Sequence, residues 1–433
     1  MIKISIPDFL FIEKQYVVSI LFNTFLGVNV DIVRSNSKNY SIWINAKYGK
    51  IVIKDSFLFT KTEDYLTLKN IPSRLIHLKI NDYSKSIIGF WGDSTFVENE
   101  EKIYIGLDIF ASAFFMLSRW EEHVVKTRDE YNRFEASDSV AYKLGFLDRP
   151  IVNEYVEFLW KLLLKIGYNG KRKEHKYTVI PTHDIDYIDF QEKSFKRFAK
   201  DIVQQRSFKL FFSRIKALFI NPFNVYEYLM YISEMHQCTS RFYFMAGGNT
   251  KYDFDSYLKS PKFKRIVNEI RDRGHIIGIH PSYNTYDNES LLKDEKQMLE
   301  EASGEMVYEG RQHYLRFKNP DTWIIWNNAG LKIDSTLSYA TIPGFRCGVC
   351  YDFPVFDIIE RKTLDLLERP LIFMDASLVK YQNTDDTNFL EQIVHLKDTV
   401  KKYNGNFVFL WHNSSFNWGN WRKYQKYYKR LFE

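Results

Sequence analysis

Side chains that could bind a metal ion or move a proton follow directly after several short apolar stretches of this sequence. The stretches and the polar residues after them are 177–181 with Asp184 and Asp186, 276–279 with His280, 371–374 with Asp375, and 407–410 with Trp411 and His412. Such runs are typical of buried parallel strands, whose C-terminal ends lie on one face of the fold. We therefore expect these carboxylates and imidazoles to meet there, as a set suited to metal-assisted hydrolysis.

The spacing of the first two carboxylates sharpens this expectation. Asp184 and Asp186 are two residues apart, so their side chains point the same way in an extended chain. Two neighbouring carboxylates repel each other, and a metal ion bound by one of them, with the other left as a base, removes that repulsion. His183 then points to the opposite face and is predicted to be structural. His275 and His280 are five apart and also face opposite ways, and His280 is the better ligand candidate because it ends the strand.

The elements that must position these residues alternate in the C-terminal part of the chain. Strands are predicted at 241–245 and 276–279, and helices at 262–273 and 290–302. Strands that alternate with helices through short connections predict parallel βα units, in either a barrel or a doubly wound sheet.

The first 170 residues are predicted to form a separate α/β domain, because short β-rich runs mix with helical patterns there. The clearest helix begins near Asp108 and covers residues 109–124. A polar stretch at 167–176 then breaks the pattern, and we place the domain boundary in it. This gives an N-terminal α/β domain, 1–170, of unknown role and a C-terminal domain, 171–433.

Length and composition limit the functions to consider. The 433 residues are 45% hydrophobic and carry a net charge of +6 without a basic block, which argues against nucleic acid as a partner. The longest apolar run, 109–117, is about half as long as a membrane span, and the first residues do not resemble a signal peptide. These features predict a cytoplasmic protein without a transmembrane segment. Cys347 and Cys350 form a lone CxxC pair, which we expect to be two small buried residues rather than a zinc or redox site.

The motif order of residues 176–433 resembles that of the polysaccharide deacetylases, carbohydrate esterase family four. The motifs are THDID, GHIIGIHPSYN, GRQHYLRF and FVFLWHN, in this order along the chain. The resemblance implies a distorted (β/α) barrel that removes N-acetyl groups from sugars with a divalent metal ion, most often zinc. A bacterial subgroup associated with surface-polysaccharide loci is also similar over the whole chain, through SRWEE, DSTLSYA and GFRCG.

The first two motifs of the family imply roles for individual residues. They pair a base aspartate with a metal-ligand aspartate, which implies these roles for Asp184 and Asp186, although the family usually has the two adjacent. The second motif supplies two ligand histidines four residues apart. Here His280 matches the first, but Asn284 stands at the second. An amide oxygen is a weaker zinc ligand than imidazole, so His313 of the third motif is the alternative third ligand.

The remaining motifs imply roles around this metal. Arg311 matches the arginine that pairs with the catalytic aspartate. His412, two residues after Leu410, matches the histidine expected to protonate the departing amine. Further residues are expected at the substrate cleft, either because the bacterial subgroup has similar motifs or because the residue directly follows a predicted strand. The residues expected to contact substrate are Asp334, Arg346, Asp375 and Trp411.

A cytosolic member of this family would act on an N-acetylated sugar precursor, either nucleotide-activated or lipid-linked. Residues 193–223 combine lysines and arginines with phenylalanines, which suits either a helix on an anionic membrane surface or an ordinary helix with a solvated basic face. Three alternatives stay open: another amide hydrolase such as a deformylase, a glycan-binding protein that lacks catalysis because Asn284 replaces a ligand, and a scaffold that recruits a glycosyltransferase.

Overall fold

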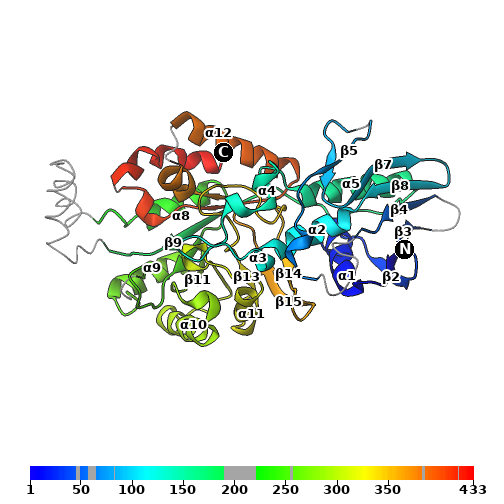
Figure 1. Ribbon diagram of the computed structural model, residues 1–433. Helices are drawn as coiled ribbons and strands as arrows, with labels where there is room; N and C mark the ends of the chain where they lie inside the picture. Colours follow the sequence, from blue (N-terminus) through cyan, green and yellow to red (C-terminus); the bar gives the residue numbers. More distant parts are fainter. Residues whose placement is uncertain are drawn as a thin grey trace.

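The computed structural model describes residues 1–44, 49–56, 65–81, 83–189, 221–253, 257–382, 386–417 and 419–433. The N-terminal residues, coloured blue to cyan, form one end of the molecule, and the chain from β9 onward forms the other (Figure 1). The helix predicted at 193–223 lies outside the described residues except for its last three positions. In the described part of the chain, no helix is both long and apolar enough to cross a membrane.

A mixed six-stranded sheet forms the centre of the N-terminal part. Its strands, in spatial order, are β2 (Val30–Ser35), β1 (Ile2–Pro7), β3 (Asn39–Trp43), β4 (Lys50–Lys54), β8 (Lys102–Leu107) and β7 (Gly92–Glu98). β5 (Ile76–Leu78) and β6 (Ile87–Gly89) pair with each other as a separate sheet. Alternate residues Ile2, Ile4 and Ile6 of β1 are fully buried, because a strand turns every second side chain toward the core.

The helices that precede β9 are α1 (Phe11–Ser19), α2 (Ile109–Leu117), α3 (Trp120–Val124), α4 (Val140–Lys143) and α5 (Ile151–Lys165). Every residue of α2 is buried, and Asp108 caps its first turn by accepting a hydrogen bond from the Ala111 N–H at 2.9 Å. The single helix predicted over 109–124 is in fact two helices. Arg119 separates them because its φ of 51° is left-handed and ends the helical path.

A nine-stranded sheet forms the centre of the C-terminal part. Its strands, in spatial order, are β14 (Phe353–Asp357), β15 (Lys362–Glu368), β13 (Ile333–Asp334), β12 (Glu309–Gly310), β11 (Ile276–Ile279), β10 (Arg241–Phe244), β9 (Thr178–Ile185), β17 (Asn406–Leu410) and β16 (Phe373–Met374). Neighbouring strands are parallel except for the β14–β15 pair. The predicted alternation of parallel βα units is therefore confirmed.

The α-helices among the described residues of this part are α8 (Tyr226–Met235), α9 (Pro261–Asp272), α10 (Glu289–Ser303), α11 (Asp321–Asn328) and α12 (Asp386–Lys402). They flank the strands, with α8 and α12 on one side and α9 to α11 on the other (Figure 1). Within the described residues the strand order ends at β14 and β16, and no ladder closes it. Leu371, just before β16, donates to the Leu337 carbonyl oxygen at 3.2 Å, so the chain there approaches the residues after β13. A closed barrel stays a prediction.

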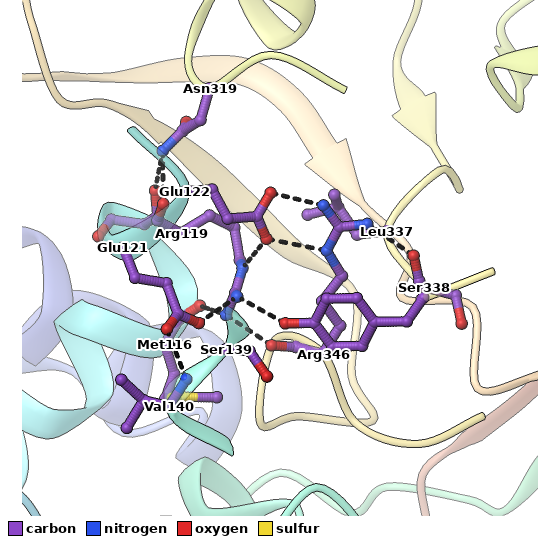
Figure 2. A network of polar contacts seen from close by, with 12 residues as sticks. Met116, Arg119, Glu121, Glu122, Ser139, Val140, Asn319, Leu337, Ser338 and Arg346 are labelled. Atoms are coloured by element: carbon purple, nitrogen blue, oxygen red, sulfur yellow. Dashed lines mark hydrogen bonds and ion pairs between the residues drawn. The ribbon is translucent and has the colours of Figure 1, made fainter. Parts of the chain in front are cut away.

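A buried network of charged side chains joins the two parts (Figure 2). Arg346, in the chain between β13 and β14, donates to Glu122 of α3 at 2.8 and 2.5 Å. Arg119 donates to the same carboxylate at 2.8 Å and to the Arg346 carbonyl oxygen at 2.5 Å. Asn319 donates to the Arg119 carbonyl oxygen at 2.7 Å. The SRWEE and GFRCG motifs thus form a contact that fixes the N-terminal part against the C-terminal part.

Candidate active site

The nine-stranded sheet brings the predicted side chains to one edge, because its parallel strands end together. The residues at or just after strand ends are Asp184 and Asp186 for β9, His280 for β11, Arg311 and His313 for β12, Asp375 for β16 and His412 for β17. Ile279 pairs with Gly310, so His280 and Arg311 leave the sheet side by side. A Cβ on Gly310 would lie 2.0 Å from the Ile279 carbonyl oxygen, so this close approach requires glycine.

Asp186, His280 and His313 form a group of potential metal ligands, and it is the one such group found among the described residues. Asp186 Oδ1 lies 3.4 Å from His280 Nε2 and 3.8 Å from His313 Nε2. A tetrahedral zinc ion with bonds of about 2.1 Å holds its ligand atoms about 3.4 Å apart. The three side chains therefore have the types and nearly the separations that a small divalent cation needs.

The hydrogen bonds around this triad leave its ligand atoms available to a metal ion. His280 Nδ1 donates to the Arg311 carbonyl oxygen at 2.8 Å, so Nε2 carries the free lone pair of the neutral ring. Asp186 Oδ1 is buried without a hydrogen-bond partner, which is costly for a carboxylate that no cation neutralises. Burial raises the pKa of Asp186, but His280 and His313 outweigh burial and lower it to about 2. The residues present fit a divalent ion.

Asp253 supports the triad from behind, and no pattern in the sequence pointed to it. Its Oδ1 faces His313 Nδ1 at 3.6 Å, and its side chain is 2% exposed. The same carboxylate accepts the N–H of Tyr283 at 2.7 Å and of Thr250 at 2.9 Å. Burial raises the pKa of Asp253, but His313 and these N–H groups lower it to about 2. A carboxylate in this position fixes the orientation of a ligand imidazole and increases its basicity.

We expect Asp253→Asn to weaken zinc binding by about tenfold to a hundredfold, because the neutral amide no longer polarises His313. Zinc affinity is measured by competition with a chromophoric chelator. Asp272→Asn, at an exposed carboxylate on α9, is the matched control and should bind zinc like the wild-type chain. Equal affinities in the two variants would show that Asp253 does not act on the site.

Asp184 lies beside the triad and is held by a buried arginine. Arg311 Nη1 donates to Asp184 Oδ1 at 2.8 Å, and the two side chains are 0% and 2% exposed. Arg311 also donates to the carbonyl and hydroxyl oxygens of Ser335, at 2.8 and 3.0 Å, so its guanidinium is fixed. Asp184 Oδ2 lies 3.7 Å from His280 Nδ1. This carboxylate lies next to the candidate metal ligands without joining them, which is the position that a base for a metal-activated water would need.

His412 faces the same space from the opposite side of β9 and is held by Asp375. Its Nδ1 donates to Asp375 Oδ1 at 2.7 Å, and its backbone N–H donates to Oδ2 at 3.1 Å. Burial lowers the pKa of His412, but the Asp375 carboxylate outweighs burial and raises it to about 9. At neutral pH this imidazole is therefore a cation that can give up a proton.

We expect the His412 imidazole to stay protonated up to about pH 9 and to lose its proton above that value. Asp375→Asn removes the neighbouring negative charge, so the titration should move at least about one pH unit lower. Nitrogen-15 NMR of the histidine rings measures this directly, with His412→Gln to assign the signal. A His412 signal that titrates at the same pH in wild type and Asp375→Asn would refute the role given to Asp375.

The site opens into a cavity of about 150 Å³. Its lining combines the triad, Asp184 and His412 with apolar side chains, which are Leu315, Ala340, Met374, Ala376 and Leu410. The lining is completed by Arg133, Tyr314, Lys380 and Tyr381, and no pattern in the sequence pointed to these four residues. Arg133 comes from the N-terminal part, and nothing in its sequence neighbourhood signals that it reaches the site.

The structure places Asn284 outside the group of ligands. Its side chain is exposed, and its Oδ1 lies 3.5 Å from Arg316 Nη1. The same guanidinium, that of Arg316, stacks over the ring of Tyr283, one residue earlier in the sequence. The guanidinium carbon lies 3.8 Å from the centre of that ring. Asn284 therefore lies beside Arg316, whereas His313 lies in the group with Asp186 and His280, and the identity of the third ligand stays a prediction.

The lining of this cavity does not include the residues predicted to contact substrate, which are Asp334, Arg346, Asp375 and Trp411. Arg346 is bound within the network of Figure 2, and Asp375 lies behind His412. Asp334 is 0% exposed and accepts a hydrogen bond from the Thr336 N–H at 3.0 Å. Trp411 is 0% exposed and packs among other aromatic rings. The structure buries all four outside the wall of this cavity, and their contact with substrate stays a prediction.

Residues 2–168 match the model of a family of unknown function, DUF7033. No curated protein matches the sequence.

Some solved structures are similar in part. A protein of Mycobacterium smegmatis assigned to the polysaccharide deacetylases shares 14% identity over 60% of this chain and 85% of its own, with a TM-score of 0.38. A CE4-family pseudoenzyme from Bacillus anthracis shares 11% identity over 59% of this chain and 60% of its own, with a TM-score of 0.31. A mutant of that pseudoenzyme with restored enzymatic activity gives the same identity and TM-score. These values describe a distant likeness and assign no activity to this chain.

Proposed function

We propose that this protein is a metal-dependent hydrolase that removes an N-acetyl group from an amino sugar or a surface-polysaccharide precursor. The observation that carries the proposal is the convergence of Asp186, His280 and His313 beside Asp184, around one cavity. A divalent ion in such a site polarises an amide carbonyl and lowers the pKa of water. We take zinc as the ion, because imidazole and carboxylate ligands suit it.

The chain's own residues supply the proton transfers of amide hydrolysis. Asp184, fixed by Arg311, takes the proton of the attacking water as that water adds to the acetamide carbon. His412, protonated through its contact with Asp375, donates its proton to the amine nitrogen as the C–N bond breaks. The products are acetate and a free amino sugar. Two groups with opposite starting charge, one base and one acid, thus flank the scissile bond.

Release of acetate from a panel of N-acetylated sugars tests this function. We expect zinc-loaded wild type to release acetate and Asp184→Asn to be slower by at least about a hundredfold, since general base catalysis contributes that much. Asp184→Asn should retain its zinc, because Asp184 is not a ligand. A matched panel of N-formylated sugars separates the deformylase alternative. Formate release without acetate release, or an Asp184→Asn variant as active as wild type, would contradict the proposal.

Zinc content and direct sugar binding test a second alternative, a glycan-binding protein without catalysis. That alternative predicts binding of an N-acetylated sugar, little zinc and no hydrolysis.

A further inference from the structure

Arg133 is a cation of the N-terminal part that faces the same cavity as the metal-ligating triad. The residue is 6% exposed, and its Nη1 donates to the Tyr314 carbonyl oxygen at 3.2 Å. Tyr314 directly follows His313, so the guanidinium lies beside the chain that carries a candidate ligand. A buried guanidinium in the wall of a cavity is a strong partner for a carboxylate or phosphate that enters it.

The turn that carries Arg133 is held in place by its own hydrogen bonds. Asp129 Oδ1 accepts the backbone N–H of Tyr131 at 2.9 Å and of Arg133 at 2.8 Å, while Oδ2 accepts Arg133 Nε at 2.7 Å. Arg316 Nε donates to the Tyr131 carbonyl oxygen at 2.9 Å and so ties the turn to the C-terminal part. Because the guanidinium is already oriented, binding an anion does not require this turn to be ordered first.

The guanidinium keeps an edge that a ligand could use. Asp129 Oδ2 lies 2.7 Å from both Nε and Nη2, whereas Nη1 donates to the Tyr314 carbonyl oxygen at 3.2 Å and reaches the Tyr381 hydroxyl only at 3.4 Å. The Tyr381 contact is long, and a charged acceptor would displace it. Lys380, an exposed residue, adds a second cation to the lining of the same cavity. The carboxylates there already have partners, because Arg311 holds Asp184 and Asp186 belongs to the triad. Arg133 also has a carboxylate partner, Asp129, but its Nη1 donates to two neutral oxygens, so Nη1 and Lys380 offer the positive charge of this cavity to a ligand.

Aromatic rings lie next to this charge. Tyr314 and Tyr381 line the cavity, and the Tyr131 ring lies 5.0 Å from the Tyr314 ring and 4.7 Å from the Arg133 guanidinium. Tyr314 has a φ of 61°, an unfavourable conformation for a tyrosine that occurs most often at functional sites. Flat rings beside a fixed cation suit the apolar face of a sugar that carries an acid group.

We propose that Arg133 determines substrate specificity by binding the carboxylate or phosphate of an acidic N-acetylated sugar. The proposal rests on the proposed deacetylase function, and it gives the N-terminal part a role in that function. A sugar carboxylate and a sugar phosphate share the feature that Arg133 would bind, which is an anionic oxygen group next to an N-acetylated sugar ring.

Isothermal titration calorimetry tests this with three probes: N-acetylglucosamine, N-acetylglucosamine 1-phosphate and N-acetylmuramic acid. We expect wild type to bind at least one acidic probe about tenfold to a hundredfold more tightly than the neutral sugar. Arg133→Met should lose that preference while its affinity for the neutral sugar stays unchanged. Arg265→Met, on α9, removes a cation elsewhere and should keep the preference. The acidic probe that is preferred shows whether phosphate or carboxylate is the ligand group.

Arg133→Lys is a second variant for the case in which Arg133→Met does not fold. It keeps the positive charge and should retain part of the preference for the acidic probe. Equal wild-type affinities for acidic and neutral probes, or no binding of any probe, would overturn the proposal. An equal loss for all probes in folded Arg133→Met would also overturn it. Zinc affinity of the same proteins is measured separately, so a failure of the metal site is distinguishable from a failure of Arg133.

Discussion

We expect His313→Ala to bind zinc at least about a hundredfold more weakly than the wild-type chain, and Asn284→Ala to bind it equally well. The reason is geometric: His313 Nε2 lies 3.8 Å from Asp186 Oδ1, whereas the Asn284 side chain is exposed and faces Arg316. Competition with a chromophoric chelator at constant pH measures both affinities.

The reverse pair of results would contradict this arrangement of ligands. If Asn284→Ala lost zinc and His313→Ala kept it, the second motif would supply the third ligand after all. Asn288→Ala is the matched control for Asn284→Ala, because it also removes an exposed amide. The Asn288 side chain caps α10, so this variant shows how a small loss of stability affects zinc affinity.

We expect Arg346→Met to lower the free energy of unfolding by about 3 to 5 kcal/mol, because it leaves the buried Glu122 carboxylate without its principal partner. Arg346 and Glu122 are 3% and 1% exposed in their side chains, and two hydrogen bonds join them. Burial raises the pKa of Glu122, but Arg346 and Arg119 outweigh burial and lower it to about 2. Urea unfolding monitored by tryptophan fluorescence measures the change.

The pH dependence of stability gives a second measure of this pair. A carboxyl whose folded pKa lies below its unfolded value stabilises the fold above the unfolded pKa, and this stability is lost as the pH falls through the folded pKa. For Glu122 the loss falls between about pH 4.5 and about pH 2. Arg346→Met raises the folded pKa, so the variant should lose less stability in this range.

Arg34→Met is the matched control, because Arg34 pairs with Asp8 at 3.5 Å on the surface, where both side chains are more than half exposed. Such a pair contributes about 1 kcal/mol or less. A similar small loss for Arg346→Met would mean that the network of Figure 2 does not hold the two parts together.

The sequence predicted the centre of the site because the topology of parallel strands determines where strand ends meet. Asp184, Asp186, His280 and His412 each follow or end a short apolar run, and the structure gathers them around one cavity. Side chains alternate between the two faces of a strand, and this alternation also distinguished His183, predicted to be structural, from the candidate ligand His280. His183 is fully buried and donates to the Trp411 carbonyl oxygen at 2.8 Å, as a structural histidine should.

The residues that the sequence missed depend on long-range packing. Asp253 and Arg133 lie in loops, and only the contact of those loops with the chain after β12 brings them to the site. Arg346 has the charged side chain of a binding site but binds Glu122 inside the protein, which a charge pattern cannot reveal. The break at Arg119 was missed for a similar reason, because its left-handed backbone accompanies a hydrogen bond from its guanidinium to the carbonyl oxygen of Arg346, which is distant in the sequence.

We propose above all that Asp186, His280 and His313 hold a divalent metal ion. A crystal of the full chain grown with zinc, with anomalous diffraction collected on both sides of the zinc absorption edge, tests it most directly. We expect one strong anomalous peak within about 2.3 Å of Asp186 Oδ1, His280 Nε2 and His313 Nε2. A peak elsewhere on the chain, or no peak at this site with zinc in excess, would contradict the claim.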